Sequence, residues 1–530
     1  MPRDNPWMKS RNALGVLVLA TALLGCSRDA EVAFAATVAL PGDAAALIPA
    51  DACVVARLGS LDALEAKAGE LQRVFDLRGG RVDLSAAFSL VGIDPTQVQR
   101  TKPIVLALVA ADPRPVGTLV VPIVDASKPP RSFLFGKPRI NGAYAGYAMG
   151  GRSDVTGAPP ALVNNMPGGD ISVRVDVARI VAAYRGVLGE DADPDALVKL
   201  VQASGAEPQA IASALWMFEG LRGWLNSTSA VDVAIGVRSG KLSFQCRMDS
   251  VAAIAPSGCD LTELMRCLVP FGGPMVFACR TAWVRDLFES LTSEAFLRAV
   301  PEEAREEVKA EFVKSAGTIR YWGDGMAFAG SLFGDSGARI AGVFKVTDVE
   351  GFRRSYDAST AAEANQRVGV ELKKEPPLEV DGVELDRFRW IADLGDVAVM
   401  QPSLVGGILP EGGLQFSYGC VRDKTVVMAI GDDEVAKQAV AAARASETDL
   451  PALVSALSDE QRRNLELFGY MDVRRLFQDA AAAVPSAGIR VNDGEPIGIW
   501  FRVNSDQRGY DAALRVDLAG IGALGKLLGR

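Results

Sequence analysis

The chain has 530 residues, a net charge of −9 and no histidine. Its length allows more than one domain, and its 49% apolar and 23% charged residues are typical of a folded globular protein. The negative charge, without a long run of Lys or Arg, excludes nucleic-acid binding through clustered phosphate contacts. The absence of histidine excludes Ser-His-Asp and Cys-His catalysis and imidazole metal sites. We therefore expect no metal, no cofactor and a non-catalytic protein, although carboxylate, lysine or tyrosine chemistry stays open.

Residues 1–25 have the features of a bacterial secretory signal. Lys9 and Arg11 precede an apolar run from Ala13 to Leu24, which is too short to span a bilayer. A compact signal of the same kind begins at Met8, so the sequence leaves open whether translation starts there or at the first residue. No later apolar run is long enough to span a membrane, and the C-terminal LAGIGALGKLLGR predicts a packing helix.

The signal ends in the sequence LLGC, whose last residue is Cys26. Leu-x-Gly-Cys resembles the lipobox of bacterial lipoproteins. The resemblance implies that Cys26 carries acyl chains such as palmitate, becomes the mature N-terminus and anchors the protein to a membrane. The protein would then lie in the cell envelope and face the periplasm or the cell surface, with the inner or outer membrane left open. A plain secretory signal with an incidental cysteine is the alternative.

Residues 26–46 are small and weakly charged, which is typical of a tether. The segment that follows, LIPADACVVARLGSLDALEAKAGELQRVF, predicts a buried strand over Cys53–Leu58 and then a helix. Ser60 is placed to cap that helix, because its hydroxyl can accept a hydrogen bond from an N–H of the first turn. The apolar residues after the cap recur at helical spacing and indicate one buried face of the helix.

The pattern of strand, cap and helix recurs three more times along the chain. ISVRVDVARIVAAY has Asp176 as the cap, MVFACRTAWVRDLF has Thr281, and LELFGYMDVRRLF has Asp472. Each cap would satisfy N–H groups that the first helical turn leaves unpaired. The recurrence favours a repeated structural unit over chance, although this local pattern is common.

A second element also occurs twice. VGTLVVPIVDASKPPRSFL ends its strand at Asp125, and ARIAGVFKVTDVEGFRRSY ends its strand at Asp348. Each is followed by a hairpin turn, at Asn141-Gly142 in the first half and at Asp381-Gly382 in the second. The caps at Ser60 and Thr281 are 221 residues apart, and the two strand-end aspartates are 223 residues apart. Matching offsets indicate an internal duplication.

The sequence therefore predicts an α+β fold of two related domains, each a mainly antiparallel sheet with helices packed on one face. Each half ends with a hairpin in which apolar and polar residues alternate. This hairpin turns at Ser239-Gly240 in the first half and around 506–509 in the second. The expected parts are a first domain at 47–255, a linker at 256–264, and a second domain at 265–530 with insertions near 350–379 and 390–410.

The opening LIPADACVVARLGSLDAL resembles a family of uncharacterised bacterial envelope proteins, known as a domain of unknown function. Pro49-Ala50-Asp51 matches the start of that family, whereas the second half has Pro270-Phe271-Gly272 at the corresponding place. The resemblance implies hairpins and an apolar strand that ends in Asp. It implies no catalytic residues.

Six cysteines follow Cys26, and their spacing matches neither a zinc ribbon nor a thioredoxin motif. A disulfide between Cys259 and Cys267 is the local candidate outside the cytoplasm. Cys53, Cys246 and Cys279 lie in alternating apolar runs, where a small buried side chain is the better interpretation.

Two segments are candidate sites. DADPDALVKLVQ spaces Asp191, Asp193 and Asp195 like a calcium loop, but the positions of its Gly and Glu are occupied by Ala and Gln, which favours an acidic helix start. RYWGDGMAF places Tyr321 and Trp322 beside Asp324, as a sugar site would. A Gly-Asp-Gly turn that leads into a strand, with both aromatic side chains in the core, is the simpler interpretation.

These observations favour a membrane-anchored envelope lipoprotein with a non-catalytic binding or scaffold role, with an envelope protein or glycan as partner. One alternative is a carboxylate-based hydrolase of envelope glycans, which needs two close carboxylates in a cleft. The other is a carrier of lipid or another apolar ligand, cupped by a curved sheet, which a continuous internal cavity lined by apolar side chains would favour and a solidly packed core would dismiss.

Overall fold

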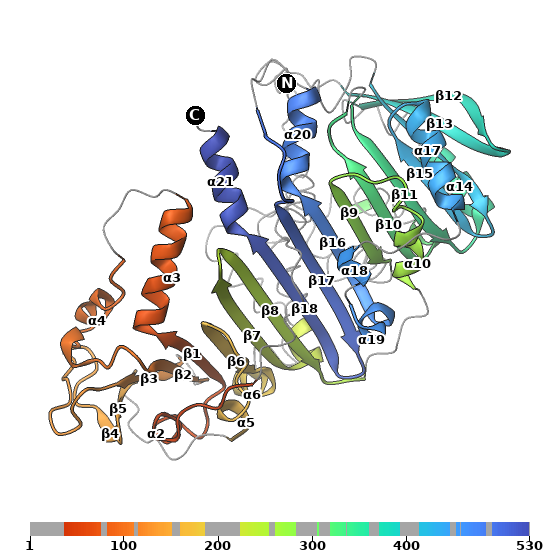
Figure 1. Cartoon of the computed structure of the whole chain (residues 1–530). Coiled ribbons are helices and arrows are strands. Elements are labelled where there is room, and N and C mark those ends of the chain that lie inside the picture. Colours follow the sequence, from red (N-terminus) through yellow and green to blue (C-terminus); the bar gives the residue numbers. More distant parts are fainter. Residues whose placement is uncertain are drawn as a thin grey trace, which may run out of the picture. The chain divides into compact units, whose positions relative to one another are not determined.

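A computed structural model shows two compact units (Figure 1). The N-terminal unit comprises Glu31–Ala255 and Ser505–Ala513, and the C-terminal unit comprises Pro256–Asn504 and Leu514–Arg530. The structure describes residues 37–75, 82–110, 115–150, 160–185, 223–253, 260–281, 305–306, 319–334, 337–359, 370–392, 413–445, 452–455, 457–483 and 490–528. Cys26 and its signal, Cys259 and the Asp191–Asp195 segment lie outside these residues.

The N-terminal unit is built on an antiparallel sheet with the order β4-β5-β3-β2-β1-β6-β7-β8. Its strands are β1 (Val54–Ser60), β2 (Pro103–Val109), β3 (Val116–Pro122), β4 (Arg139–Asn141), β5 (Tyr144–Met149), β6 (Ile171–Asp176), β7 (Thr228–Arg238) and β8 (Lys241–Ser250). The segment Ser505–Ala513 belongs to this unit, where Arg508 accepts a hydrogen bond of 2.7 Å from the Ser250 N–H.

Helices pack on both faces of this sheet, so the prediction of helices on one face is wrong. Along β2, Ile104 lies in one core cluster and Val105 in the other, and both are buried. Because the strand is apolar on both sides, both faces need cover. The helices are α2 (Gly42–Ala45), α3 (Leu61–Val74), α4 (Ala86–Leu90), the 3₁₀ turn η1 (Pro95–Gln97), α5 (Pro160–Val163) and α6 (Val177–Ala183).

The folded part of this unit also begins earlier than expected. Leu40 and Ala44, inside the segment 26–46 that was expected to be a tether, are buried in the core beneath β1 and β2. Val38 pairs with Met166 in an isolated β-bridge. Small side chains with little charge can pack closely against a core. In this segment those properties therefore reflect core packing and not a flexible tether.

The C-terminal unit has an antiparallel sheet with the order β12-β13-β14-β15-β11-β10-β9-β16-β17, and β18 follows β17 in a hairpin (Figure 1). The strands are β9 (Met275–Arg280), β10 (Trp322–Ser331), β11 (Arg339–Val346), β12 (Val370–Val380), β13 (Val383–Ala392), β14 (Leu414–Arg422), β15 (Thr425–Ile430), β16 (Leu465–Asp472), β17 (Gly498–Asp506) and β18 (Gly509–Asp517).

Helices cover both faces of this sheet as well. α10 and α17 pack on small side chains such as Ala278, Ala327 and Ala341, whereas α14, α20 and α21 contribute to cores on the opposite face. The helices are α10 (Leu261–Arg266), α14 (Val349–Ser359), α17 (Asp433–Arg444), α18 (Ala452–Ser455), α19 (Asp459–Arg463), α20 (Val473–Ala483) and α21 (Leu518–Leu528). α10 starts at the fully buried Leu261, so the last residues of the expected linker 256–264 are part of this core.

The predicted helix caps are confirmed at three positions. The Ser60 hydroxyl accepts from the Ala63 N–H at 3.3 Å, and the Asp176 and Asp472 carboxylates accept from the N–H groups of Arg179 and Arg475 at 3.0 and 3.2 Å. The helix expected after Thr281 lies outside the described residues. The Thr281 hydroxyl donates to the Gly323 carbonyl oxygen.

The turns at Ser239-Gly240 and Asp381-Gly382 are confirmed, whereas β4 and β5 are joined one position later than expected, through Gly142-Ala143. One proposed match between the hairpins is wrong. Asp381 and Gly382 have φ values of 49° and 74° and join β12 to β13 at the edge of the sheet. In the first half, the β4–β5 hairpin that begins near Asn141 pairs with β3. The hairpin in the corresponding place of the second half, which pairs with β11, is β14–β15 and not β12–β13. The Asp381 turn therefore has no counterpart among the described residues of the first half.

Cys267 is a free, buried thiol, so it does not form the candidate disulfide with Cys259. Cys53 and Cys279 are also free and buried, as the apolar runs around them predicted, and Cys246 is half-buried. Within the described ranges, no helix has both the length and the apolar character needed to cross a membrane.

Candidate functional site

The aromatic residues weighed as a sugar site are used by the fold. Tyr321 and Trp322 pack against the core that includes Phe352, and Asp324 is exposed. The Arg320 guanidinium stacks on the Tyr321 ring at 4.7 Å and donates to its hydroxyl at 2.8 Å. The Gly-Asp-Gly segment lies within β10, at an irregularity between Trp322 and Met326, rather than in a turn before the strand. The aromatic faces are therefore partly occupied by protein atoms.

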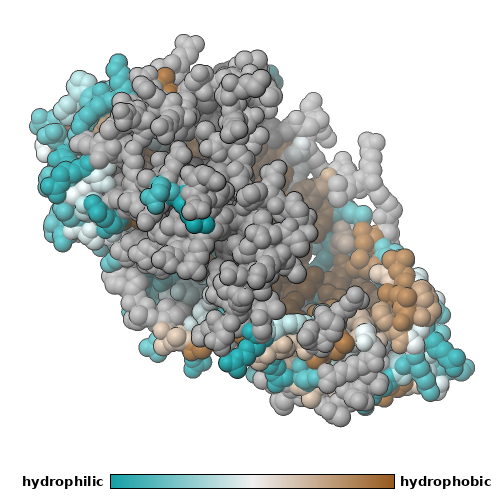
Figure 2. Space-filling model, turned by 180° about the vertical axis from the view of Figure 1, so that it is seen from behind, coloured by the Kyte–Doolittle hydropathy of each residue, from teal (hydrophilic) through white to brown (hydrophobic). Residues whose placement is uncertain are grey.

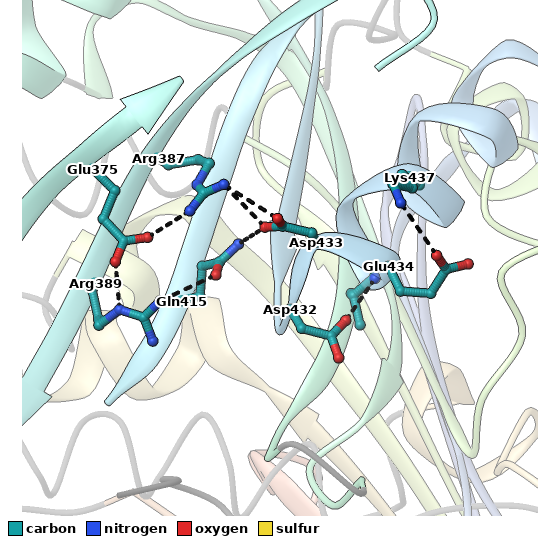
Figure 3. A network of polar contacts seen from close by, with 9 residues as sticks. Glu375, Arg387, Arg389, Gln415, Asp432, Asp433, Glu434 and Lys437 are labelled. Carbon is teal, nitrogen blue, oxygen red and sulfur yellow. Dashed lines mark hydrogen bonds and ion pairs between the residues drawn. The ribbon is translucent and has the colours of Figure 1, made fainter. Parts of the chain in front are cut away.

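The most connected polar site is a closed ring of five side chains (Figure 3). Glu375 of β12 accepts from Arg387 at 3.0 Å and from Arg389 at 2.6 Å, both on β13. Arg387 reaches Asp433, the first residue of α17, at 3.2 Å. Gln415 of β14 completes the ring, since it donates to Asp433 at 2.7 Å and accepts from Arg389 at 3.4 Å.

This ring, which we call the polar ring, balances its own charge. Two guanidinium groups face two carboxylates, and the hydrogen bonds of Arg389 and Arg387 lower the pKa of Glu375. A carboxylate held ionised in this way is a poor proton donor at neutral pH. The members of the polar ring come from three strands and the start of a helix. The ring is therefore suited to holding β12–β14 against α17 and not to acid–base catalysis.

A second polar site lies on the sheet of the N-terminal unit. Arg174, Asp232 and Arg247 are cross-strand neighbours on β6, β7 and β8. Arg174 Nε lies 3.4 Å from Asp232 Oδ1, and no hydrogen-bond donor of the described residues meets that oxygen. Arg247 binds Asp506 through two hydrogen bonds of 2.7 and 3.0 Å and Asp249 through one of 3.0 Å.

Burial raises the pKa of Asp232 to about 6, against the attraction of Arg174. A carboxyl with this pKa can act as a general acid. The nearby Asp249 is already bound to Arg247, whose own pKa is raised by Asp506 and Asp249. The site therefore offers Asp232 as one candidate acid, whereas the second carboxylate, Asp249, is paired with Arg247.

An apolar site crosses the sheet of the C-terminal unit. Phe501 of β17, Phe277 of β9, Phe328 of β10 and Met428 of β15 lie in one cross-strand row, with Gly469 and Gly342 between them on β16 and β11. These four large side chains, which we call the aromatic strip, are half-buried. They lie on the face whose two ends carry the cores of α14 and of α20 and α21.

The two glycines explain how the strip lies on the sheet. A Cβ at Gly342 would come within 2.6 Å of the Phe328 ring, and a Cβ at Gly469 would collide with the Phe501 ring. Without Cβ atoms at these glycines, the rings can lie across the backbone of the neighbouring strands. Both glycines stand in apolar strands of the sequence, and an isolated glycine in a strand is the signal that such a close approach leaves.

The described residues contain no group of three or more His, Cys, Asp and Glu side chains arranged to hold a metal ion. They therefore bring together three sites: the polar ring, the Asp232 row and the aromatic strip. Of these three, the strip is apolar and half-buried, and the Asp232 row has a carboxyl group whose pKa is shifted toward neutrality.

Comparisons with known proteins give little further help. No family model matches the chain, and no curated protein matches it. Among solved structures, the chain has a likeness to the one titled "Structure of crystal form IV of TP0453", with 6% identity over 48% of this chain and 92% of that chain. The TM-score is 0.22, which is too low to support an argument about fold or function.

Proposed function

We propose that the protein is a membrane-anchored, non-catalytic binding protein of the bacterial cell envelope, and that its aromatic strip receives an apolar ligand such as the acyl chain of a lipid. The strip is the observation that carries this proposal. It places Phe277, Phe328, Met428 and Phe501 side by side on one sheet face, where they are half-buried.

The chemistry of the strip fits an acyl chain. Flat rings and a flexible thioether adapt to a ligand of variable shape, and they gain from dispersion contacts without fixed hydrogen-bond partners. The Phe277 and Phe501 rings lie 6.4 Å apart, so one extended chain can contact both. A site of this composition favours apolar ligands over sugars, which need polar side chains to orient hydroxyl groups.

The anchor is the second part of the proposal. The lipobox-like end of the signal supports acylation of Cys26, which would hold the protein at a membrane whose lipids are candidate ligands. A binding protein held at the source of its ligand needs no long diffusion to find it.

We also propose that the two units arose by duplication. Strands that occupy the same position in the two sheets also follow one another in the same order along the chain. The two sheet orders that match in this way are β5-β3-β2-β1-β6-β7-β8 and β15-β11-β10-β9-β16-β17-β18. Asp176 and Asp472 end corresponding strands and cap the helices that follow. β12 and β13 would then be an insertion in the second copy.

A carboxylate-based glycan hydrolase is the second candidate, and the raised pKa of Asp232 is the observation in its favour. A hydrolase also needs a second carboxylate, free to act as base or nucleophile. Asp249 is bound to Arg247 at 3.0 Å, so it is not free for that role. Loss of a measurable glycan-cleaving activity in Asp232→Asn, with the fold retained, would favour this candidate over binding.

Native mass spectrometry of the full-length protein, extracted from membranes in mild detergent, tests the binding proposal. We expect bound lipid that survives desolvation, and saturable binding of a fluorescent fatty acid. The double variant Phe277→Ser, Phe501→Ser should weaken this binding by about tenfold or more, because it removes most of the ring contact.

The control is the double variant Trp390→Ser, Ile391→Ser, which changes two exposed apolar residues of β13 outside the strip. It should bind the fatty acid like the parent. Equal binding by the parent and both variants, with no lipid retained by the purified protein, would contradict the ligand site and leave the anchor to be tested separately.

A further inference from the structure

The N-terminal unit carries an exposed apolar surface at the end where α4 meets the connection between β3 and β4. Leu90, Phe133 and Leu134 are 77%, 74% and 58% exposed, respectively. Single exposed apolar residues are ordinary on protein surfaces. These three are held together, because the Ser132 hydroxyl donates to the Val91 carbonyl at 2.5 Å and the Phe133 ring lies against Gly92. We call Leu90, Phe133 and Leu134 the apolar tip.

The loop beneath the apolar tip is firmly built. Ser132 is only 4% exposed, and its hydroxyl accepts from the N–H groups of Leu134 and Phe135 at 3.2 and 3.0 Å. Ser132 and Gly136 exchange two backbone hydrogen bonds, of 3.3 and 2.9 Å. At the other end of the loop, the buried Tyr147 hydroxyl donates to the Pro130 carbonyl at 2.6 Å.

The loop thus holds large apolar side chains in solvent in a fixed arrangement. If these side chains served only the stability of the unit, packing them inward would bury more apolar area. Phe135, in the same loop, does turn inward and packs against the core. The outward position of its two neighbours indicates a surface that meets something outside the unit.

The loop that carries Phe133 and Leu134 is also rich in basic residues. Lys128, Arg131 and Lys137 are exposed in the same connection, which contains a single acidic residue, Asp125, and Arg139 is exposed at the start of β4. The chain as a whole has a net charge of −9, so this loop differs sharply in sign from the average. Figure 2 shows brown apolar residues beside teal hydrophilic ones at the end of this unit that carries α4, at the right of that view.

We propose that the apolar tip docks on a lipid bilayer that contains anionic lipids. Leu90, Phe133 and Leu134 enter the boundary between headgroups and acyl chains, while the flanking Lys and Arg side chains stay at the lipid phosphates. An apolar centre with a basic border matches that boundary, where hydrocarbon lies directly beneath negative charge.

This contact goes beyond the binding proposed above, and it depends on neither Cys26 acylation nor the aromatic strip. It would orient the N-terminal unit on the membrane, because the rigid loop fixes which side of the unit faces the lipid.

Depth-dependent fluorescence quenching tests the docking. A fluorescent acridone amino acid replaces Phe133 in the full-length chain, which is bound to vesicles of equal parts phosphatidylcholine and phosphatidylglycerol that contain nitroxide-labelled lipid. The control chain carries the probe at Arg238, in the exposed β7–β8 turn. β7 is four strands from β3 in the same sheet, about 19 Å away.

We expect the lipid nitroxide to quench the probe at position 133 roughly twofold or more above the probe at position 238. Leu90→Ser with Leu134→Ser should remove this excess. Lys128→Gln with Lys137→Gln should reduce it on anionic vesicles and leave neutral vesicles unchanged. All four positions are exposed, so the unfolding transition of the variants should match that of the parent.

Equal quenching at the two positions would overturn the proposal. So would a change in the emission of the probe at position 133 that depends on protein concentration and occurs without vesicles, since a second copy of the chain would then cover the tip. Failure of lipid retention by the aromatic strip would leave this result untouched, because the probe reports on the loop alone.

Discussion

The rings of Phe277 and Phe501 lie 6.4 Å apart, centre to centre, across the backbone of Gly469. They belong to strands that are not neighbours, β9 and β17, with β16 between them. The contact exists because Gly469 has no side chain to separate the rings. A glycine in a central strand normally costs stability, and here that cost is offset by aromatic contact across the strand.

The first prediction follows from that contact. Gly469→Ala should lower the free energy of unfolding by about 1–3 kcal/mol, since the added Cβ collides with the Phe501 ring. Phe501→Ala in the same chain should recover part of the loss, because the smaller side chain makes room. Urea unfolding of the two single variants and the double variant measures the coupling, and strictly additive effects would contradict the contact.

The polar ring gives a second prediction. Glu375→Gln leaves Arg387 and Arg389 facing a neutral amide, and we expect a loss of about 1–3 kcal/mol in the free energy of unfolding at pH 7. Glu434→Gln is the matched control, because Glu434 is exposed and 3.7 Å from Lys437, and it should change stability by about 0.5 kcal/mol at most.

The pH dependence of the same variant supplies a separate check. The pKa of Glu375 is lowered in the folded protein, so the unfolded chain takes up a proton first as the pH falls. The stability that Glu375 contributes is therefore present above its unfolded pKa and lost at lower pH. The difference between parent and Glu375→Gln should shrink on acidification, and a constant difference would argue against an ionised Glu375.

For Asp232 we expect the opposite dependence of stability on pH. Its pKa of about 6 lies above the ordinary value of 3.8, so the folded protein holds the proton more tightly than the unfolded chain. Stability should fall as the pH rises from about 4 to about 6, by roughly 2–3 kcal/mol in total. Asp232→Asn should remove this fall, and unfolding curves across that range would reveal it. A parent and variant with parallel pH profiles would contradict the raised pKa.

The membrane anchor can be tested on the mature N-terminus. We expect mass spectrometry of the membrane fraction to find a diacyl- or triacyl-cysteine at Cys26, and Cys26→Ser to abolish it. An unmodified N-terminus in the soluble fraction would rule out the lipoprotein assignment. The variant also separates the anchor from the apolar tip, because tip docking should persist in Cys26→Ser.

Local sequence patterns determined much of the secondary structure. Ser60, Asp176 and Asp472 were predictable as caps, because a cap depends only on N–H groups within three residues of it. The turns at Ser239-Gly240 and Asp381-Gly382 were predictable for the same reason, since positive φ is a property of the turn itself. The C-terminal apolar segment likewise forms the predicted helix α21.

Tertiary structure alone decided which elements meet. Glu375 and Asp433 lie 58 positions apart in the sequence, and only the pairing of β12, β13 and β14 beside α17 brings both to Arg387. The aromatic strip and the cover on both sheet faces depend in the same way on strand order and register. Many orders and registers satisfy the same alternation of apolar residues, so the local pattern determined the strands while long-range packing chose their neighbours.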